Sequence, residues 1–209
     1  MLFSFNELSP HLKKPVKGVI HVGAHKAEEH VIYKNAGIEK TIWVEANPML
    51  LNEILGKTIM SPGQSVHLAA AHEKDFEIVK LNVANNGESS SILDLDYHKI
   101  AHPHIHYIGQ IEIPTRRVDS IVNKGGYRAQ EFNFMNIDVQ GAELIVLKGS
   151  TSLLSDTVDY VYTEVNEKYL YKDCALVGEL DEFLSHYGFK RDLTRMTEYG
   201  WGDALYVKH

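Results

Sequence analysis

The chain has 209 residues, a formal net charge of −7 and 44% hydrophobic residues. A single α/β domain of this size buries roughly 70% of the surface that its unfolded chain exposes, so no disulfide or metal is needed to stabilise it. The negative charge argues against nucleic-acid binding, which requires a concentrated basic face. No apolar run approaches the ~20 residues that cross a bilayer, so membrane insertion is not expected.

The amino-terminal residues 1–16 have neither the basic start nor the sustained apolar core of a signal peptide, and we interpret them as an N-terminal extension of the domain. The one cysteine, Cys174, has no partner for a disulfide or a CxxC site and is interpreted as a small buried hydrophobe. These features favour a cytoplasmic protein. No repeat or linker divides the sequence, so residues 1–209 are expected to form one domain.

The first part of the chain alternates strand and helix signals. A β-branched run at Lys17–Val22 ends at Gly23, and a helical pattern follows over Lys26–Asn35. Lys40–Glu45 repeats the strand pattern, and Asn47 with the proline after it supplies the N-cap and first turn of a second helix. This order predicts a βαβα unit.

The middle of the chain is less regular. Gln64–Ala71 and Phe76–Val83 are candidate strands separated by a polar turn. Residues 84–110 show little periodicity, and a segment of this length in a compact domain is typical of a lid or an acceptor-binding loop. A strand near Ile111–Thr115 and a helix over Val118–Lys124 follow it.

The last part of the chain returns to alternating strands and helices. The predicted elements are a buried strand at Phe132–Asp138, a helix over Gly141–Gly149, a strand at Thr157–Glu164, a helix over Leu176–His186 and an antiparallel pair at Phe189–Leu193 and Ala204–Lys208. Strands that alternate with helices predict an α/β fold, in which helices cover both faces of a mostly parallel sheet. The last pair would close this sheet as an antiparallel hairpin.

Two residues that follow strands indicate a nucleoside site, because ligands of parallel sheets bind at the carboxyl ends of the strands. Gly23 permits a sharp turn close to a ligand, and Glu45 follows the next strand, where a carboxylate can accept both hydroxyls of a ribose. Ala27 and Glu28 stand where a GxGxxG turn would place glycines to receive a pyrophosphate. The pattern therefore favours a nucleoside without phosphates, such as S-adenosylmethionine, over NAD.

Five segments in this order resemble the FkbM-type methyltransferases: IHVGAHKAEEHVIYKNAG, IWVEANP, NNGESSSIL, RRVDSIV and NIDVQGAELIVLKG. The resemblance covers about residues 17–167. It departs at His21, His25 and Ala27, where family members often have an acid, an asparagine and a glycine. The short chain is also similar to stand-alone sugar O-methyltransferases of large algal viruses.

The resemblance implies a seven-stranded Rossmann-like sheet that binds S-adenosylmethionine and methylates an oxygen. Its preferred acceptor is a sugar hydroxyl, of a deoxy-hexose such as rhamnose or fucose in a glycan, with a polyketide or other small-molecule hydroxyl as the alternative. By the same resemblance, Gly23 and His25 line the methionine end of the cofactor, Glu45 holds its ribose, Ala46 and Asn47 flank the adenosine, and Asn85 and Ser90 lie in a loop over the cofactor or acceptor. Simple turn chemistry is the other interpretation of this loop.

Methyl transfer to a hydroxyl requires a group that takes up the proton. Asp138 at the end of a buried strand is one candidate base, and His102 and His104 in the lid are the others. Asp138, Glu164 and Asn166 follow adjacent strands, and such oxygen ligands suit Mg²⁺ or Mn²⁺. The alternative is that these acids only orient the substrate or cap helices.

Several roles stay open at this point. Tyrosines of the lid region and beyond would stack on a sugar ring or simply be half buried; they are Tyr97, Tyr107, Tyr169 and Tyr171. A homodimer through a sheet edge is compatible with the pattern but is not required by it. A non-catalytic nucleoside-binding module and a nicotinamide oxidoreductase are the competing function classes.

Overall fold

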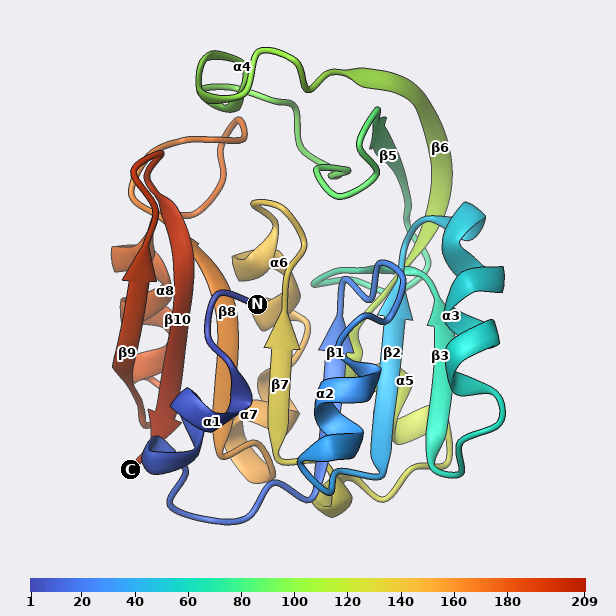
Figure 1. The fold of residues 1–209 in the computed structure, drawn as a ribbon, viewed down its shortest axis with the longest axis vertical. Helices are drawn as coiled ribbons and strands as arrows, with labels where there is room; N and C mark the ends of the chain where they lie inside the picture. The colour runs from blue at the N-terminus through green and yellow to red at the C-terminus, as the bar shows by residue number, and fades with distance from the viewer.

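The computed structural model describes residues 1–209, and its main feature is a seven-stranded sheet in the order β3-β2-β1-β7-β8-β10-β9 (Figure 1). The parallel strands are β1 (Gly18–Val22), β2 (Lys40–Glu45), β3 (Gln64–Leu68), β7 (Phe134–Ile137) and β8 (Tyr160–Asn166). The last strand, β10 (Trp201–Lys208), runs antiparallel to both β8 and β9 (Phe189–Met196). This arrangement confirms the predicted α/β fold, a mostly parallel Rossmann-like sheet that closes with an antiparallel hairpin.

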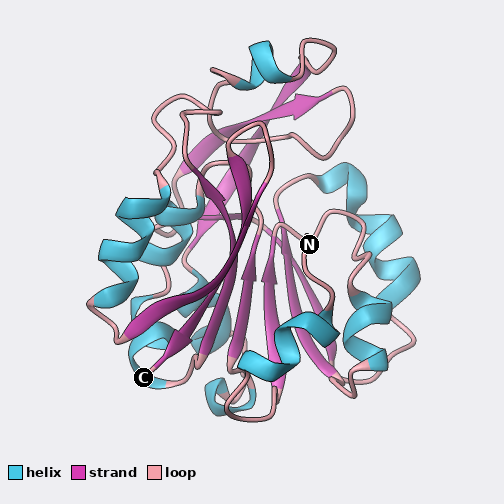
Figure 2. Cartoon of the chain, turned by 60° about the vertical axis from the view of Figure 1, so that its left-hand side comes forward, coloured by secondary structure: helices cyan, strands magenta, loops and turns pink.

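Helices cover both faces of the sheet (Figure 2). One face packs against α5 (Val118–Lys124), α6 (Glu143–Lys148), α7 (Thr151–Asp156) and α8 (Val177–Ser185). The other face packs against α1 (Phe5–Leu8), α2 (His30–Asn35) and α3 (Leu51–Thr58). Three short 3-10 helices are η1 (Ser9–His11), η2 (Pro48–Leu50) and η3 (Ala129–Glu131). None of the helices is long and apolar enough to span a bilayer.

The central strands are buried on both sides, which explains their nearly continuous apolar sequences. Successive side chains of a strand point to opposite faces. Ile20 and Val22 of β1 therefore join the core under α5–α8, whereas Val19 packs with Trp43 of β2 in the core under α1–α3. All four side chains are at most 1% exposed, so the middle of the sheet gives the strand ends a rigid support.

The strand predicted at Gln64–Ala71 is in fact two strands in two sheets. β3 ends at Leu68, and β4 (Ala70–Ala71) pairs with β6 (Tyr107–Arg116) in a second sheet of order β4-β6-β5, where β5 is Ile78–Ala84. The chain changes sheet at Ala69, whose N–H donates to the carbonyl oxygen of Glu45 at 2.9 Å. The pairing of β4 with the distant strand β6 determines where the chain passes from one sheet to the other, so no local sequence pattern marks this point.

The predicted lid at residues 84–110 is shorter than expected, since β5 runs to Ala84 and β6 already begins at Tyr107. The first residues of β6 are exposed on both sides, so they carry no burial alternation that would reveal a strand. The loop itself contains α4 (His98–Ala101) and arches above the carboxyl ends of the parallel strands (Figure 1). It is anchored below, where the N–H groups of Asp96 and His98 donate to the carbonyl oxygen of Leu170.

The N-terminal segment 1–16 packs on the sheet and contributes to its core. Ser4 and Glu7 form a capping box at the start of α1. Leu8 is fully buried, and the N–H of Phe3 donates to the Tyr162 hydroxyl at 3.2 Å. Because these contacts join residues more than 150 positions apart, the sequence pattern of the segment gave no sign of them.

Two helix boundaries and one helix differ from the sequence predictions. The helix expected from Lys26 begins at His30, because Ala27 has a left-handed backbone with φ 51°. The helix expected from Gly141 begins at Glu143 for the same reason, since Gly141 has φ 97°. The prediction also lacked α7, which follows α6 after a break at Gly149 and Ser150.

Candidate active site

The turn after β1 holds three residues in left-handed backbone conformations. Gly23 has φ 85°, His25 has φ 45° and Ala27 has φ 51°. A Cβ on Gly23 would lie 1.8 Å from the carbonyl oxygen of Asp138, so only glycine fits there. Such local strain concentrates at ligand sites, where the surrounding structure fixes an unfavourable backbone. The turn thus brings β1 against the end of β7, where a ligand can approach the backbone.

We expect Gly23→Ala to lower the free energy of unfolding by at least ~3 kcal/mol, because it adds a backbone clash to the cost of a left-handed alanine. Gly37→Ala is the matched control, since Gly37 also has a positive φ, 76°, but nothing lies within 4 Å of its Cβ position. The control isolates the left-handed cost of roughly 1–2 kcal/mol. Urea unfolding of both variants measures the difference, and equal losses would contradict the close approach of the two strand ends.

Glu45 ends β2 and its carboxylate closes this turn. Its Oε2 accepts the backbone N–H of His25 at 2.8 Å, and its Oε1 accepts that of Asn47 at 2.7 Å. The side chain is 8% exposed, and burial raises its pKa while these two hydrogen bonds oppose the rise. Each carboxylate oxygen accepts more than one hydrogen bond, so both can also receive a hydroxyl of a ribose.

Glu45 borders a cavity of about 620 Å³ between the ends of β1 and β2 and the lid loop. We call this space the inner cavity. Its lining includes six of the seven residues predicted to contact the cofactor, namely Gly23, His25, Glu45, Ala46, Asn47 and Ser90. Asn47 also caps the next helix, because its Oδ1 accepts the N–H of Met49 at 3.0 Å. The structure thus gathers these six residues around one space that is large enough for a nucleoside.

Asn85, the seventh predicted cofactor residue, lies elsewhere. Its Oδ1 accepts the N–H of His106 at 3.1 Å, and its Nδ2 donates to the carbonyl oxygen of His104 at 3.0 Å. The side chain is exposed and lines neither the inner cavity nor the larger one beside it. Asn85 therefore ties the two ends of the lid together, and its neighbour Asn86 is the asparagine that reaches a cavity.

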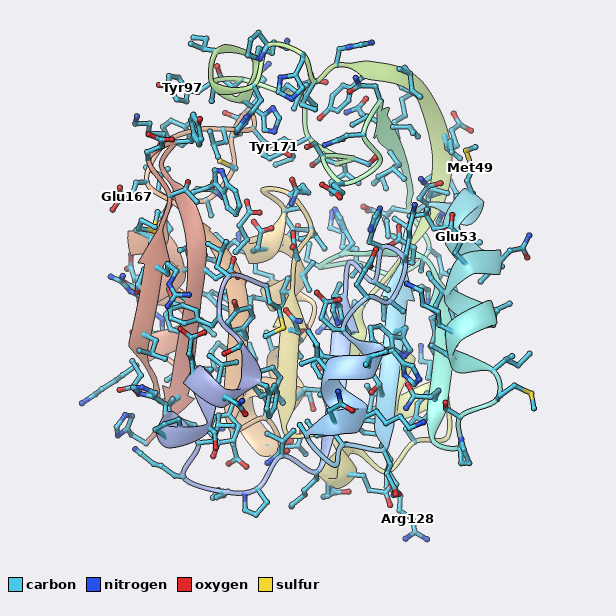
Figure 3. The ribbon with its side chains drawn as sticks, viewed as in Figure 1. Met49, Glu53, Tyr97, Arg128, Glu167 and Tyr171 are labelled. Carbon is cyan, nitrogen blue, oxygen red and sulfur yellow. The ribbon has the colours of Figure 1, made fainter.

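A second cavity of about 1370 Å³ lies under the lid, and we call it the lid cavity. It shares five lining residues with the inner cavity: Gly23, His25, Glu88, Asp138 and Gln140. Leu170 and Tyr171 of the loop after β8 form another wall, and Trp201 of β10 and residues 1–2 complete it. Tyr171 reaches the space below the lid in Figure 3. Two spaces thus meet at the carboxyl end of β7.

Gln140 is the centre of a hydrogen-bond network at this meeting point, and the sequence analysis did not assign it a role. Its Nε2 donates to Asp138 Oδ1 at 2.7 Å and to Glu164 Oε2 at 3.0 Å. Its Oε1 accepts the Tyr171 hydroxyl at 2.6 Å, which fixes the orientation of the amide. Gln140 has φ 57°, and its place two residues after Asp138 in the NIDVQG segment was the available signal.

Three acids near this point have raised pKa values. Desolvation raises the pKa of Asp138 to about 6, although its side chain opens to the cavities and Gln140 opposes the rise. Burial raises the pKa of Glu143 to about 7 and that of Glu164 well above its usual range. Asp203 adds to the shifts of Asp138 and Glu164, because like charges disfavour ionisation.

We expect the raised pKa of Glu143 to make the protein less stable as the pH rises from about 4.5 to about 7. The folded state then holds a proton that the unfolded state has lost, so ionisation of Glu143 destabilises the folded state by the order of 1–3 kcal/mol. Glu143→Gln keeps an acceptor for the N–H groups of Val139 and Gly141 and removes the titration. Urea unfolding at pH 5 and pH 8 should show a smaller loss for this variant than for the wild type. An identical loss would contradict the assignment.

The predicted Mg²⁺ or Mn²⁺ site at Asp138, Glu164 and Asn166 is not supported. No group of three or more His, Cys, Asp or Glu side chains has the geometry to hold a metal ion. The Gln140 amide lies between the two acids, and the Asn166 amide donates to Glu164 Oε1 at 3.3 Å. Asn166 is fully buried and lines neither cavity. Amide donors thus occupy Asp138 Oδ1 and both oxygens of Glu164.

The predicted histidines lie on the lid side of the lid cavity. His102 and His104 both line it, with their ring centroids 6.2 Å apart. His98 lines it as well and is 6% exposed, and burial lowers its pKa to about 4. His98 is therefore neutral at pH 7 and is not a base of the usual imidazole strength.

Of the four tyrosines considered for sugar stacking, only Tyr171 lines the lid cavity. The Tyr107 hydroxyl instead donates to the carbonyl oxygen of Leu93, and Tyr97 packs under the Lys168 ammonium. Trp201, which the sequence analysis missed, is the second aromatic side chain of the lining. Cys174 is 2% exposed among apolar side chains, as predicted for a structural cysteine.

Comparisons with solved structures show that the fold is that of S-adenosylmethionine-dependent methyltransferases. An FkbM methyltransferase from Methylobacillus flagellatus KT superposes with a TM-score of 0.62 at 16% identity, over 95% of this chain and 45% of that one. The ribosomal protein L11 methylase of Lactobacillus delbrueckii subsp. bulgaricus gives 0.53 at 12%, over 99% and 77%. Magnesium protoporphyrin IX methyltransferase of Synechocystis, with bound S-adenosylmethionine, gives 0.51 at 9%, over 98% and 75%.

Residues 21–191 match the family model described as the methyltransferase FkbM domain. The chain belongs to the FkbM methyltransferase family, whose expected cofactor is S-adenosylmethionine. It spans less than half the length of the FkbM protein from Methylobacillus flagellatus KT. No curated protein matches the sequence. The inner cavity fits the cofactor, because a buried carboxylate with free acceptor capacity faces it beside a turn that only glycine permits.

Proposed function

We propose that the protein transfers a methyl group from S-adenosylmethionine to a hydroxyl group of a sugar, such as a deoxy-hexose of a glycan. The observation that carries this proposal is the contact between two cavities at Asp138 and Gln140. The inner cavity has the residues for an adenosyl group. The lid cavity is lined mostly by polar side chains and by two aromatic ones, Tyr171 and Trp201. This combination suits a ring with several hydroxyls better than an apolar polyketide.

Bound S-adenosylmethionine supplies the methyl carbon, and its C–S bond breaks as the acceptor oxygen attacks, with the electron pair going to sulfur. The protein has to hold the acceptor oxygen ~3 Å behind that carbon, in line with the bond. Asp138 lies on the wall common to both cavities and takes up the hydroxyl proton. Its pKa of about 6 leaves it mostly ionised at pH 7 while making it a stronger base than an ordinary aspartate.

Gln140 and Tyr171 position this base. The Gln140 amide donates to Asp138 Oδ1, which leaves Oδ2 to accept the proton of the sugar hydroxyl. The Tyr171 hydroxyl fixes the amide in the orientation that points its N–H groups at the acids. His102 and His104 on the opposite wall contact other hydroxyls of the sugar.

The test is product formation from methyl-labelled S-adenosylmethionine with rhamnosides, fucosides and other glycosides, with a polyketide alcohol as the competing acceptor. We expect label in at least one glycoside and none in the polyketide. Label in the polyketide alone would assign the alternative acceptor. Tight cofactor binding without labelled product from any acceptor would favour a non-catalytic nucleoside-binding module. Binding of NAD would favour a nicotinamide oxidoreductase.

A further inference from the structure

Acidic side chains predominate in the lining of the lid cavity. Its lining contains six carboxylic acids and no lysine or arginine side chain. The acids are Glu28, Glu29, Glu88, Asp138, Glu164 and Asp203. Its basic groups are histidines and the Met1 ammonium, which lies 3.7 Å from Glu29 Oε1 in the same lining. A charge of one sign along the walls of a concave site repels ligands of the same sign before they enter.

The acids occupy both the floor and the rim of this cavity. Glu164 and Asp203 are buried at the floor, each 6% exposed, and Asp138 faces the space between them and the inner cavity. Glu28 and Glu88 are exposed at the rim. Burial raises the pKa of Glu164 well above its usual range, and the other five acids complete the set. An anionic group of a ligand would therefore lie near acidic side chains both at the rim and at the floor of the lid cavity.

Apart from the Met1 ammonium, which pairs with Glu29 in the lining, the neighbouring cations make their contacts outside the lid cavity. Lys26 pairs with Glu53 at 3.5 Å, and Arg195 pairs with Glu7 at 2.7 Å. Lys168 lies 4.7 Å above the ring of Tyr97. Burial lowers the pKa of His98 to about 4, so this imidazole adds no positive charge at pH 7. None of these groups is placed to bind a phosphate in the cavity.

The lining also contains an imidazole that is neutral at pH 7. His98 is 6% exposed, and its Nδ1 is enclosed without a hydrogen-bond partner, so only the rest of the ring borders the cavity. Since the ring is neutral, a hydroxyl is a suitable partner, whereas an anion gains no charge attraction from it.

We propose that the acceptor is an uncharged sugar already joined to its glycan or aglycone, and that sugar nucleotides and sugar phosphates are excluded. This inference rests on the proposed function and specifies the substrate of the same site. A phosphate on such a sugar would have to share the lid cavity with the exposed acids Glu28 and Glu88, which line it. Glycosyl transfer, which joins the sugar to its acceptor and releases the nucleoside diphosphate, must then precede methylation and supply the substrate.

The test compares methyl α-L-rhamnopyranoside, L-rhamnose 1-phosphate and dTDP-L-rhamnose as acceptors of labelled methyl, with the equivalent L-fucose compounds alongside. We expect kcat/KM to be about 30-fold or more higher for the methyl glycoside than for either anionic form, because like charges at this range disfavour binding. A nucleotide sugar that reacts as well as the glycoside would overturn this inference and leave sugar methylation intact. If none of the sugar compounds accepts the labelled methyl group, the proposed function is wrong, and this inference falls with it.

Replacing single acids with glutamine tests which side chains cause the preference for the glycoside over the 1-phosphate. We expect Glu28→Gln and Glu88→Gln each to narrow the ratio of kcat/KM between the glycoside and the 1-phosphate by about 3- to 10-fold. Glu182→Gln makes the same change in net charge on an exposed face of α8, outside both cavities, and should leave the ratio unchanged. A higher salt concentration should narrow the wild-type ratio as well. If this kcat/KM ratio changes neither in the rim variants nor at higher salt, the preference for the uncharged acceptor does not have an electrostatic origin.

Discussion

Replacing Glu45 with glutamine should weaken S-adenosylmethionine binding by about 10- to 100-fold. Hydrogen bonds to a charged group contribute ~1.5–3 kcal/mol, and the ribose hydroxyls lose a charged acceptor in this variant. Glu45→Ala should have a larger effect, because it also leaves the N–H groups of His25 and Asn47 without their acceptor. Isothermal titration calorimetry with the cofactor measures both affinities.

The matched control is Glu53→Gln, which removes one exposed carboxylate paired only with Lys26 on the surface. We expect its cofactor affinity to equal that of the wild type. Circular dichroism and a urea titration separate a binding defect from a folding defect in the Glu45 variants. Wild-type affinity in folded Glu45→Gln would show that the inner cavity does not hold the ribose.

Replacing Asp138 with asparagine should lower kcat by about 10²- to 10⁴-fold, because the variant loses the group that accepts the hydroxyl proton. Asparagine retains an oxygen for the Gln140 amide, so the network and the cofactor affinity should change by less than about threefold. Single-turnover methylation gives the rate, and calorimetry gives the affinity. Asp156→Asn, at an exposed position of α7 outside both cavities, is the control and should keep wild-type values for both.

The pH dependence tests the same assignment independently. The ionised carboxylate is the active form of the base, so kcat/KM should fall about tenfold per pH unit below the Asp138 pKa of about 6 and level off above it. This acidic limb should disappear in the residual activity of Asp138→Asn. If the limb persists there and disappears in His102→Gln or His104→Gln, a lid histidine is the base and the role of Asp138 is wrong.

The strand ends of the site were predictable because their signals are local. A β-branched run that stops at Gly23, and a second run that stops at Glu45, mark positions where a parallel sheet presents ligand groups. Asp138 follows a third such run. The structure places these three residues around the same space, as the order of the strands requires. Their chemical roles remain predictions for the experiments above.

Other parts of the site depend on contacts between distant segments, and local pattern could not reveal them. Asn85 was expected at the cofactor but binds the backbone of His104 and His106 instead, since the register of β5 with β6 decides where it lies. The Gln140 amide takes the place foreseen for a metal ion because the loop after β8 brings Tyr171 against it.

The sequence by itself determined the α/β class, the alternation of strands and helices in the main sheet and the position of Gly23, Glu45 and Asp138 at strand ends, because hydrophobic periodicity and turn residues act over a few neighbouring positions. Only the tertiary structure decided that the N-terminal segment lines the lid cavity and that β4 pairs in the second sheet and not in the main one. It also decided that six acids, and no lysine or arginine side chain, line the cavity under the lid. Those features arise from packing and pairing between residues far apart in the chain, which no short pattern encodes.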